Sequence, residues 1–124
     1  MSNLAVRPAH GKGRGVFALV DFEEGAVVAA NPMSKFTGEL GEEINTGAMK
    51  RYKFDCRNGS EAKFVVWGYM TLVNHSDKPN VSVLMAETEN GAFAYLVATR
   101  AIKAGEEIMH SYTNVEEHGL PTAL

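Results

Sequence analysis

Residues 74–80 concentrate polar side chains that could bind a ligand. They read Asn-His-Ser-Asp-Lys-Pro-Asn, between an apolar run and an alternating one. These residue types favour a turn. However, the amides of Asn74 and Asn80 and the imidazole of His75 offer more hydrogen-bonding groups than a turn requires. The segment therefore predicts either a polar turn or one wall of a binding site.

A second candidate binding segment lies near the start of the chain. Residues 10–15 read His-Gly-Lys-Gly-Arg-Gly, and a short apolar run follows them. Glycine reaches backbone angles closed to other residues and lets a ligand approach the main chain. The segment is no nucleotide-binding fingerprint, because its spacing differs and it leads into a predicted strand rather than a helix. A plain glycine-rich hairpin is the alternative.

Length and composition limit the class of protein. The chain has 124 residues, of which 45% are hydrophobic and 22% are charged, which predicts one globular domain. No segment reaches the length of a membrane span, and residues 1–9 lack the features of a secretory signal. The single cysteine, Cys56, cannot form an internal disulfide. We therefore expect an intracellular, cytoplasmic protein without membrane contact.

Net charge and histidine spacing argue against two further functions. The net charge of −3 disfavours direct binding of nucleic acid and is compatible with a basic peptide or protein partner. Neither any two of the histidines nor a histidine with Cys56 have the short spacing that is usual for metal ligands. We therefore expect no metal site. The four histidines are His10, His75, His110 and His118.

The elements that must position these segments are predicted to be mostly strands, because no amphipathic helix of ten or more residues is visible. Hairpin turns are predicted at Asn58-Gly59 and Asn90-Gly91. Pro32 is predicted to end a buried strand. Helical turns are predicted within residues 42–50 and 69–73. Extended segments are predicted at residues 3–8, 16–20, 26–30, 35–40, 51–55, 62–66, 81–87, 92–99 and 107–112.

One pattern occurs twice in the chain. Residues 18–28 and 98–108 both have Ala, then an apolar residue four positions on, then Gly, then a β-branched residue. Each copy is typical of a strand, a glycine turn and a second strand. The repeat predicts two small sheets folded against each other through two similar corners.

Five motifs follow one another along the chain. They are Gly-Arg-Gly-Val-Phe at 13–17, Phe-Thr-Gly-Glu-Leu at 36–40, Tyr-Lys-Phe-Asp at 52–55, Asn-His-Ser-x-x-Pro-Asn at 74–80, and Gly-Glu-Glu-Ile-x-x-Ser-Tyr at 105–112. Together they resemble the SET domain of protein lysine methyltransferases. The resemblance covers residues 4–112 of a single domain spanning residues 1–124, with residues 113–124 as a short tail.

The resemblance implies a mostly β fold, a β-clip of small curved sheets with few short helices. The segment ending at Tyr112 would thread past residues 74–80 in a C-terminal pseudoknot. The implied activity is transfer of a methyl group from S-adenosylmethionine to the ε-amine of a lysine in a protein substrate.

The resemblance also assigns roles to individual residues. The implied catalytic residues are Tyr112 and Tyr52. The implied cofactor-binding residues are Lys12, Gly13, Arg14, Gly15, Asn74, His75 and Tyr112. The implied walls of the substrate lysine channel are Phe36, Tyr52, Phe54 and Tyr112.

The chemistry of the reaction needs residues of these types. A free lysine has a pKa of about 10.4, so making its amine neutral at pH 7 costs roughly 4–5 kcal/mol. An aromatic, water-poor channel and a nearby sulfonium both lower that pKa. Tyrosine hydroxyls can then orient the amine, and positioning supplies the remaining rate.

Two alternatives and one open question remain. A SET-like module without turnover would bind a partner or the cofactor, and Phe36, where the family usually has Tyr, favours it slightly. A small β domain of unrelated function is the other alternative. The tail contains no cysteine cluster, so we expect a second subunit, the substrate or the tail to close the lysine channel. A homodimer is therefore possible.

Overall fold

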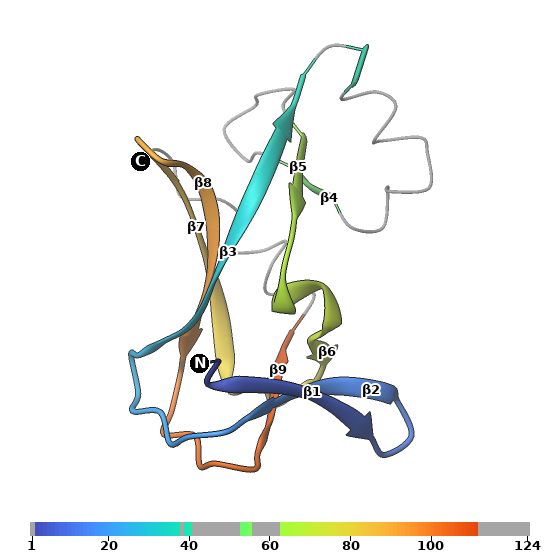
Figure 1. Ribbon diagram of the computed structural model, residues 1–124, viewed down its shortest axis with the longest axis vertical. Coiled ribbons are helices and arrows are strands. Elements are labelled where there is room, and N and C mark those ends of the chain that lie inside the picture. The colour runs from blue at the N-terminus through green and yellow to red at the C-terminus, as the bar shows by residue number, and fades with distance from the viewer. Residues whose placement is uncertain (1, 38, 41–52, 56–62, 112–124) are drawn as a thin grey trace.

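The computed structural model describes residues 2–37, 39–40, 53–55 and 63–111, and of residues 53–55 and 63 it describes the backbone only. The described chain is mostly strand, arranged in two small sheets (Figure 1). The predicted mostly β fold class is therefore confirmed. Within this described part, no helix has the length and apolarity needed to cross a membrane.

The two sheets share no strand. The four-stranded sheet has the order β1-β2-β9-β6, and the five-stranded sheet has the order β4-β5-β3-β8-β7. In Figure 1 the β1–β2 hairpin crosses the lower end of the molecule, and β5 lies above it, beside β3. The first sheet comprises β1 (Leu4–Ala9), β2 (Gly13–Ala18), β9 (Glu107–His110) and β6 (Asn74–His75). The second comprises β4 (Lys53–Asp55), β5 (Lys63–Val66), β3 (Val27–Phe36), β8 (Gly91–Ala98) and β7 (Val81–Thr88).

A hydrophobic core joins the sheets. Along β8, Ala94, Leu96 and Ala98 are buried, whereas Phe93 and Tyr95 are only half-buried and stack with ring centroids 5.9 Å apart. This alternation is expected because successive strand residues point to opposite faces. The 3-10 helix η2 (Tyr69–Leu72) follows β5 and adds Met70 to the core, which confirms the predicted helical turn.

The repeated pattern forms a pair of corners that bond to each other reciprocally. Phe22 and Ile102 exchange backbone hydrogen bonds of 2.8 and 2.9 Å. The Gly25 amide donates to the Ala98 carbonyl, and the Gly105 amide donates to the Ala18 carbonyl, both at 2.8 Å. Both glycines have positive φ, 86° and 94°, which other residues rarely adopt. The prediction of two sheets joined through similar corners is confirmed.

The prediction that Pro32 ends a buried strand is wrong. β3 continues through Pro32 to Phe36, and its residues alternate between buried and exposed. In an antiparallel pair, the N–H and C=O of one residue face the same neighbour. The Pro32 carbonyl accepts from Trp67 at 3.0 Å, so the missing N–H faces the same side, just beyond the end of β5. Pro32 therefore costs no hydrogen bond to β8.

Most other predicted elements form, with shifted bounds. β7 and β8 pair antiparallel as predicted, but Thr88 already pairs with Gly91, so the connecting residues are 89–90. β2 begins at Gly13, inside the predicted glycine loop. β4 pairs antiparallel with β5. The Asn58-Gly59 turn between them lies outside the described residues, as does the helical turn predicted within residues 42–50.

Candidate functional site

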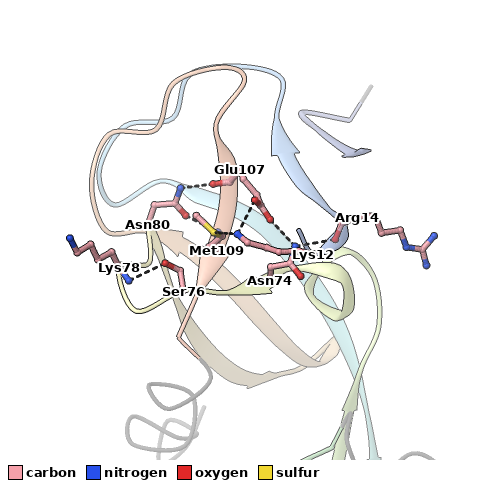
Figure 2. Close-up of polar contacts among 8 residues, drawn as sticks. All are labelled: Lys12, Arg14, Asn74, Ser76, Lys78, Asn80, Glu107 and Met109. Atoms are coloured by element: carbon pink, nitrogen blue, oxygen red, sulfur yellow. Dashed lines mark hydrogen bonds and ion pairs between the residues drawn. The ribbon is translucent and has the colours of Figure 1, made fainter. Parts of the chain in front are cut away.

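Asn80 anchors the 74–80 segment to β9. Its Nδ2 donates to the Glu107 carbonyl at 2.8 Å, and its Oδ1 accepts from the Met109 amide at 2.9 Å (Figure 2). Its backbone amide also donates to the Met109 carbonyl at 3.0 Å. Asn80 as a whole is 1% exposed. Both ends of this amide are therefore used inside the protein, and Asn80 has a structural role.

Asn74 joins the two candidate binding segments. Its Nδ2 donates to the Arg14 carbonyl at 3.0 Å and to Glu107 Oε2 at 2.8 Å. Asn74 lies in β6, which pairs parallel with β9, and β9 pairs with β2 on its other side. The structure thus brings residues 12–15 and residue 74 together, as the site prediction requires.

Glu107 is the residue that the sequence analysis missed. Its carboxylate accepts from Asn74 on Oε2 and from Lys12 Nζ on Oε1, the latter at 3.3 Å (Figure 2). The Lys12 ammonium also lies 3.1 Å from Met109 Sδ. The Glu107 side chain is 13% exposed, against 38% for Lys12. The available signal was a carboxylate on a strand that has a neighbouring strand on each side. Such a residue is rarely buried unless its charge is paired.

Gly15 leaves room for this contact. A Cβ atom at Gly15 would lie 2.5 Å from Glu107 Oε2 and 2.9 Å from Asn74 Nδ2. Gly11 and Gly13 have positive φ, and a Cβ there would meet nothing within 4 Å. Gly15 therefore makes space for protein side chains, whereas the turn before it leaves its backbone open to a ligand.

The remaining cofactor-binding candidates differ in orientation. The Arg14 side chain points away from Asn74 and Glu107, whereas Lys12 points toward them (Figure 2). His75 is exposed, and its Nε2 lies 3.2 Å from Asp77 Oδ1. Lys12 is therefore the cation placed at the centre of this cluster.

Two of the four lysine-channel candidates, Phe36 and Phe54, lie in the five-stranded sheet. Phe36 is half-buried at the end of β3. The backbone of Phe54 lies in β4 opposite Phe64 of β5. Tyr52 and Tyr112 lie outside the described residues. Ser111, the residue before Tyr112, directly follows β9, so the chain enters Tyr112 from the strand that carries Glu107.

His110 is a buried imidazole beside the site. It pairs with His75 across the β6–β9 ladder and is 4% exposed. The pKa of His110 is lowered to about 4, chiefly by burial; a backbone hydrogen bond with Ser111 opposes the shift, and the charge of His75 adds to it. His110 is therefore neutral at pH 7.

This burial predicts a pH-dependent stability. Below pH 6.5 the unfolded chain binds a proton at His110 that the folded protein does not bind, so the free energy of unfolding falls as the pH drops toward 4. The full effect is about 3 kcal/mol. Urea unfolding at pH 7 and pH 4.5 should show that His110→Phe flattens the pH dependence. An unchanged slope in this variant, or an equal change in the exposed control His10→Ala, would contradict the assignment.

Metal binding has no support from the described side chains, among which no three His, Cys, Asp or Glu come together in a way that could hold an ion. The cluster around Asn74 therefore offers hydrogen-bonding and charged groups as its chemistry. These are the side-chain oxygen Oδ1 of Asn74, the Lys12 ammonium and the exposed backbone of residues 11–14.

Comparison with known proteins agrees with the motifs. The SET domain sequence pattern matches residues 13–113. A crystal structure of a Plasmodium falciparum protein, provisionally assigned as a histone methyltransferase, has a TM-score of 0.73 and 23% identity over 90% of this chain and 94% of its own. The chain is also similar to ctPRC2 in an autoinhibited conformation bound to S-adenosylmethionine. That match has a TM-score of 0.71 and 20% identity over 90% of this chain and 15% of that one.

The solved structures show the fold of the chain, and the sequence pattern shows its family. No curated protein matches the chain. At these identities the two solved structures show a shared fold, whereas the sequence pattern covers most of the chain. The chain therefore belongs to the SET domain family.

Proposed function

We propose that the protein transfers a methyl group from S-adenosylmethionine to the ε-amine of a lysine in a protein substrate. The contact between Asn74 Nδ2 and the Arg14 carbonyl carries this proposal. It joins the two segments that the family motif assigns to the cofactor, and β9 leads from there toward Ser111 and Tyr112. Membership of a methyltransferase family supports the same reaction class.

The polar groups around Asn74 fit the amino-acid end of S-adenosylmethionine. Asn74 Oδ1 makes no hydrogen bond to the residues that the structure describes, so it could accept from an ammonium. Lys12 supplies a cation for a carboxylate. We assign cofactor binding to Lys12, Gly13, Arg14, Gly15, Asn74, His75 and Tyr112, with the Arg14 contribution coming from its backbone. The S-adenosylmethionine bound to the ctPRC2 neighbour is consistent with this ligand.

The chain's own residues would then prepare the substrate lysine. The cofactor, when bound, supplies an electrophilic methyl group. Phe36, Tyr52, Phe54 and Tyr112 would form a channel that excludes water and so favours the neutral amine. The hydroxyls of Tyr52 and Tyr112 would orient the amine lone pair toward the methyl carbon.

The partner proposed here is a protein or peptide with an exposed lysine. Net charge of −3 is compatible with a basic substrate. A homodimer remains a prediction, based on the need to close the lysine channel. The alternative function is a SET-like module that binds cofactor or partner without turnover, favoured by the absence of a hydroxyl at Phe36.

Calorimetry with S-adenosylmethionine tests the cofactor proposal first. We expect the wild-type protein to bind, and Asn74→Ala to weaken binding at least tenfold, because the variant loses the acceptor Oδ1 and the bond to the glycine segment. Asn3→Ala, which changes an exposed asparagine just before β1, is the matched control and should bind like wild type. Failure of the wild type to bind at millimolar cofactor would contradict the proposed function. Unchanged affinity in Asn74→Ala would remove Asn74 from the site.

A further inference from the structure

Glu107 contacts two of the residues assigned to the cofactor. One carboxylate oxygen accepts from Asn74 Nδ2 at 2.8 Å, and the other accepts from Lys12 Nζ at 3.3 Å. The Glu107 side chain is 13% exposed, so solvent screens these contacts only weakly. We infer that Glu107 is a positioning residue, which fixes the amide of Asn74 so that Oδ1 faces the ligand. The inference rests on the proposed function and adds a residue that the family motif assignments above do not include.

The partners of Asn74 determine which way its amide faces. An amide side chain has one donor end and one acceptor end. The Arg14 carbonyl can only accept, and an ionised carboxylate can only accept. Both lie within 3.0 Å of the same Asn74 atom, which must therefore be the nitrogen. Oδ1 is left as the acceptor for an incoming donor.

The same carboxylate also holds the cation. Because Lys12 and Asn74 bind the two oxygens of one carboxylate, their free groups lie close together. A ligand that binds both must bring a hydrogen-bond donor for Asn74 Oδ1 and a negative group for Lys12. A free α-amino-acid end, as in S-adenosylmethionine, has this combination in its ammonium and carboxylate, whereas a simple nucleoside has donors but no negative group.

Gly15 provides an independent reason to regard the contact as built into the fold. A Cβ at that position would come within 2.5 Å of Glu107 Oε2 and within 2.9 Å of Asn74 Nδ2. Backbone φ at Gly15 is not in the positive range that demands glycine. The space for the Glu107–Asn74 contact, and not backbone conformation, is therefore what this glycine supplies.

The first test uses the free protein. Glu107→Gln keeps the shape of the side chain but replaces one of the two carboxylate oxygens by an NH₂ group. Either Asn74 Nδ2 or Lys12 Nζ must then face a donor instead of an acceptor. We expect the two Asn74 side-chain amide protons, measured by nuclear magnetic resonance, to exchange with solvent at least tenfold faster in this variant. Glu106→Gln is the matched control, because Glu106 pairs with Arg100 at 3.1 Å instead. Unchanged Asn74 exchange in Glu107→Gln would overturn the inference.

The second test measures affinity for S-adenosylmethionine by calorimetry. We expect Glu107→Gln to weaken binding about 10- to 100-fold, and Glu106→Gln to change it less than about twofold. If Glu107 acts through Asn74, the double variant Glu107→Gln with Asn74→Ala should bind S-adenosylmethionine less than about threefold more weakly than Asn74→Ala alone. Equal losses in both backgrounds, or full affinity in Glu107→Gln, would overturn the positioning role.

The two proposals fail in different ways. A wild-type protein that does not bind S-adenosylmethionine contradicts the proposed function, while the exchange rates of Asn74 still decide whether Glu107 orients the amide. A wild-type protein that binds, together with a Glu107→Gln variant that binds equally well, contradicts only the positioning role.

Discussion

Replacing Tyr112 by Phe is expected to remove most methyl transfer and to change the affinity for S-adenosylmethionine by no more than a few-fold. The family motif assigns the Tyr112 hydroxyl to the reacting amine, and in the sequence Tyr112 follows the end of β9 by two positions. Loss of one preorganised hydrogen-bonding group at a reacting centre costs about 10²–10³ in rate. Single-turnover transfer and calorimetry on the same samples separate the two quantities.

Tyr95→Phe is the control for this experiment. Tyr95 stacks on Phe93 on the outward face of β8, and loss of its hydroxyl should leave both quantities unchanged. A Tyr112→Phe variant with the wild-type rate would show that the catalytic assignment is wrong. A variant that loses cofactor binding and rate together would show that Tyr112 acts mainly in binding.

Replacing Asn80 by Ala is expected to lower the free energy of unfolding by roughly 3 kcal/mol. The change deletes both side-chain hydrogen bonds to β9 and leaves the Glu107 carbonyl and the Met109 amide without these partners in a partly buried region. Each such loss costs about 1–3 kcal/mol. Urea unfolding followed by circular dichroism measures the difference.

Asn80→Asp refines this prediction, because it keeps the size of the side chain. The acceptor for Met109 remains, but the donor to the Glu107 carbonyl is replaced by an oxygen, so this variant should also be destabilised at pH 7. The exposed Asn3→Ala control should lie within about 0.5 kcal/mol of wild type. Wild-type stability in both Asn80 variants would show that this residue does not hold the 74–80 segment to β9.

Local sequence patterns were sufficient for much of the fold. The Asn90-Gly91 pair, the strand alternation of residues 92–98 and the repeat of residues 18–28 all correspond to observed structure. The turn and the alternation depend on residues close in sequence, whereas the two corners were found because their sequence pattern occurs twice, although their hydrogen bonds join distant segments. The prediction at Pro32 was wrong. Whether a proline interrupts a strand depends on which neighbouring strand its missing N–H would face. At Pro32 that neighbour is the distant segment at Trp67, which the local sequence does not reveal.

The sequence indicated which segments form the candidate site, but not the hydrogen bonds that join them. The residue types of Asn74 and the 12–15 segment indicated ligand binding, and the fold brings them together through the Arg14 carbonyl. Glu107 was missed because its partners lie 33 and 95 positions away along the chain. Only the β2-β9-β6 strand order reveals that one carboxylate can reach both of them.

Transfer of labelled methyl groups from S-adenosylmethionine to a panel of basic proteins tests the central claim most directly. Mass spectrometry of the products locates the label. We expect methyl groups on lysine ε-amines with the wild-type protein, a weaker signal with Asn74→Ala and almost none with Tyr112→Phe. A wild-type protein that binds S-adenosylmethionine but labels no lysine in its substrates or in itself would contradict the proposed activity and favour a silent SET-like binding module.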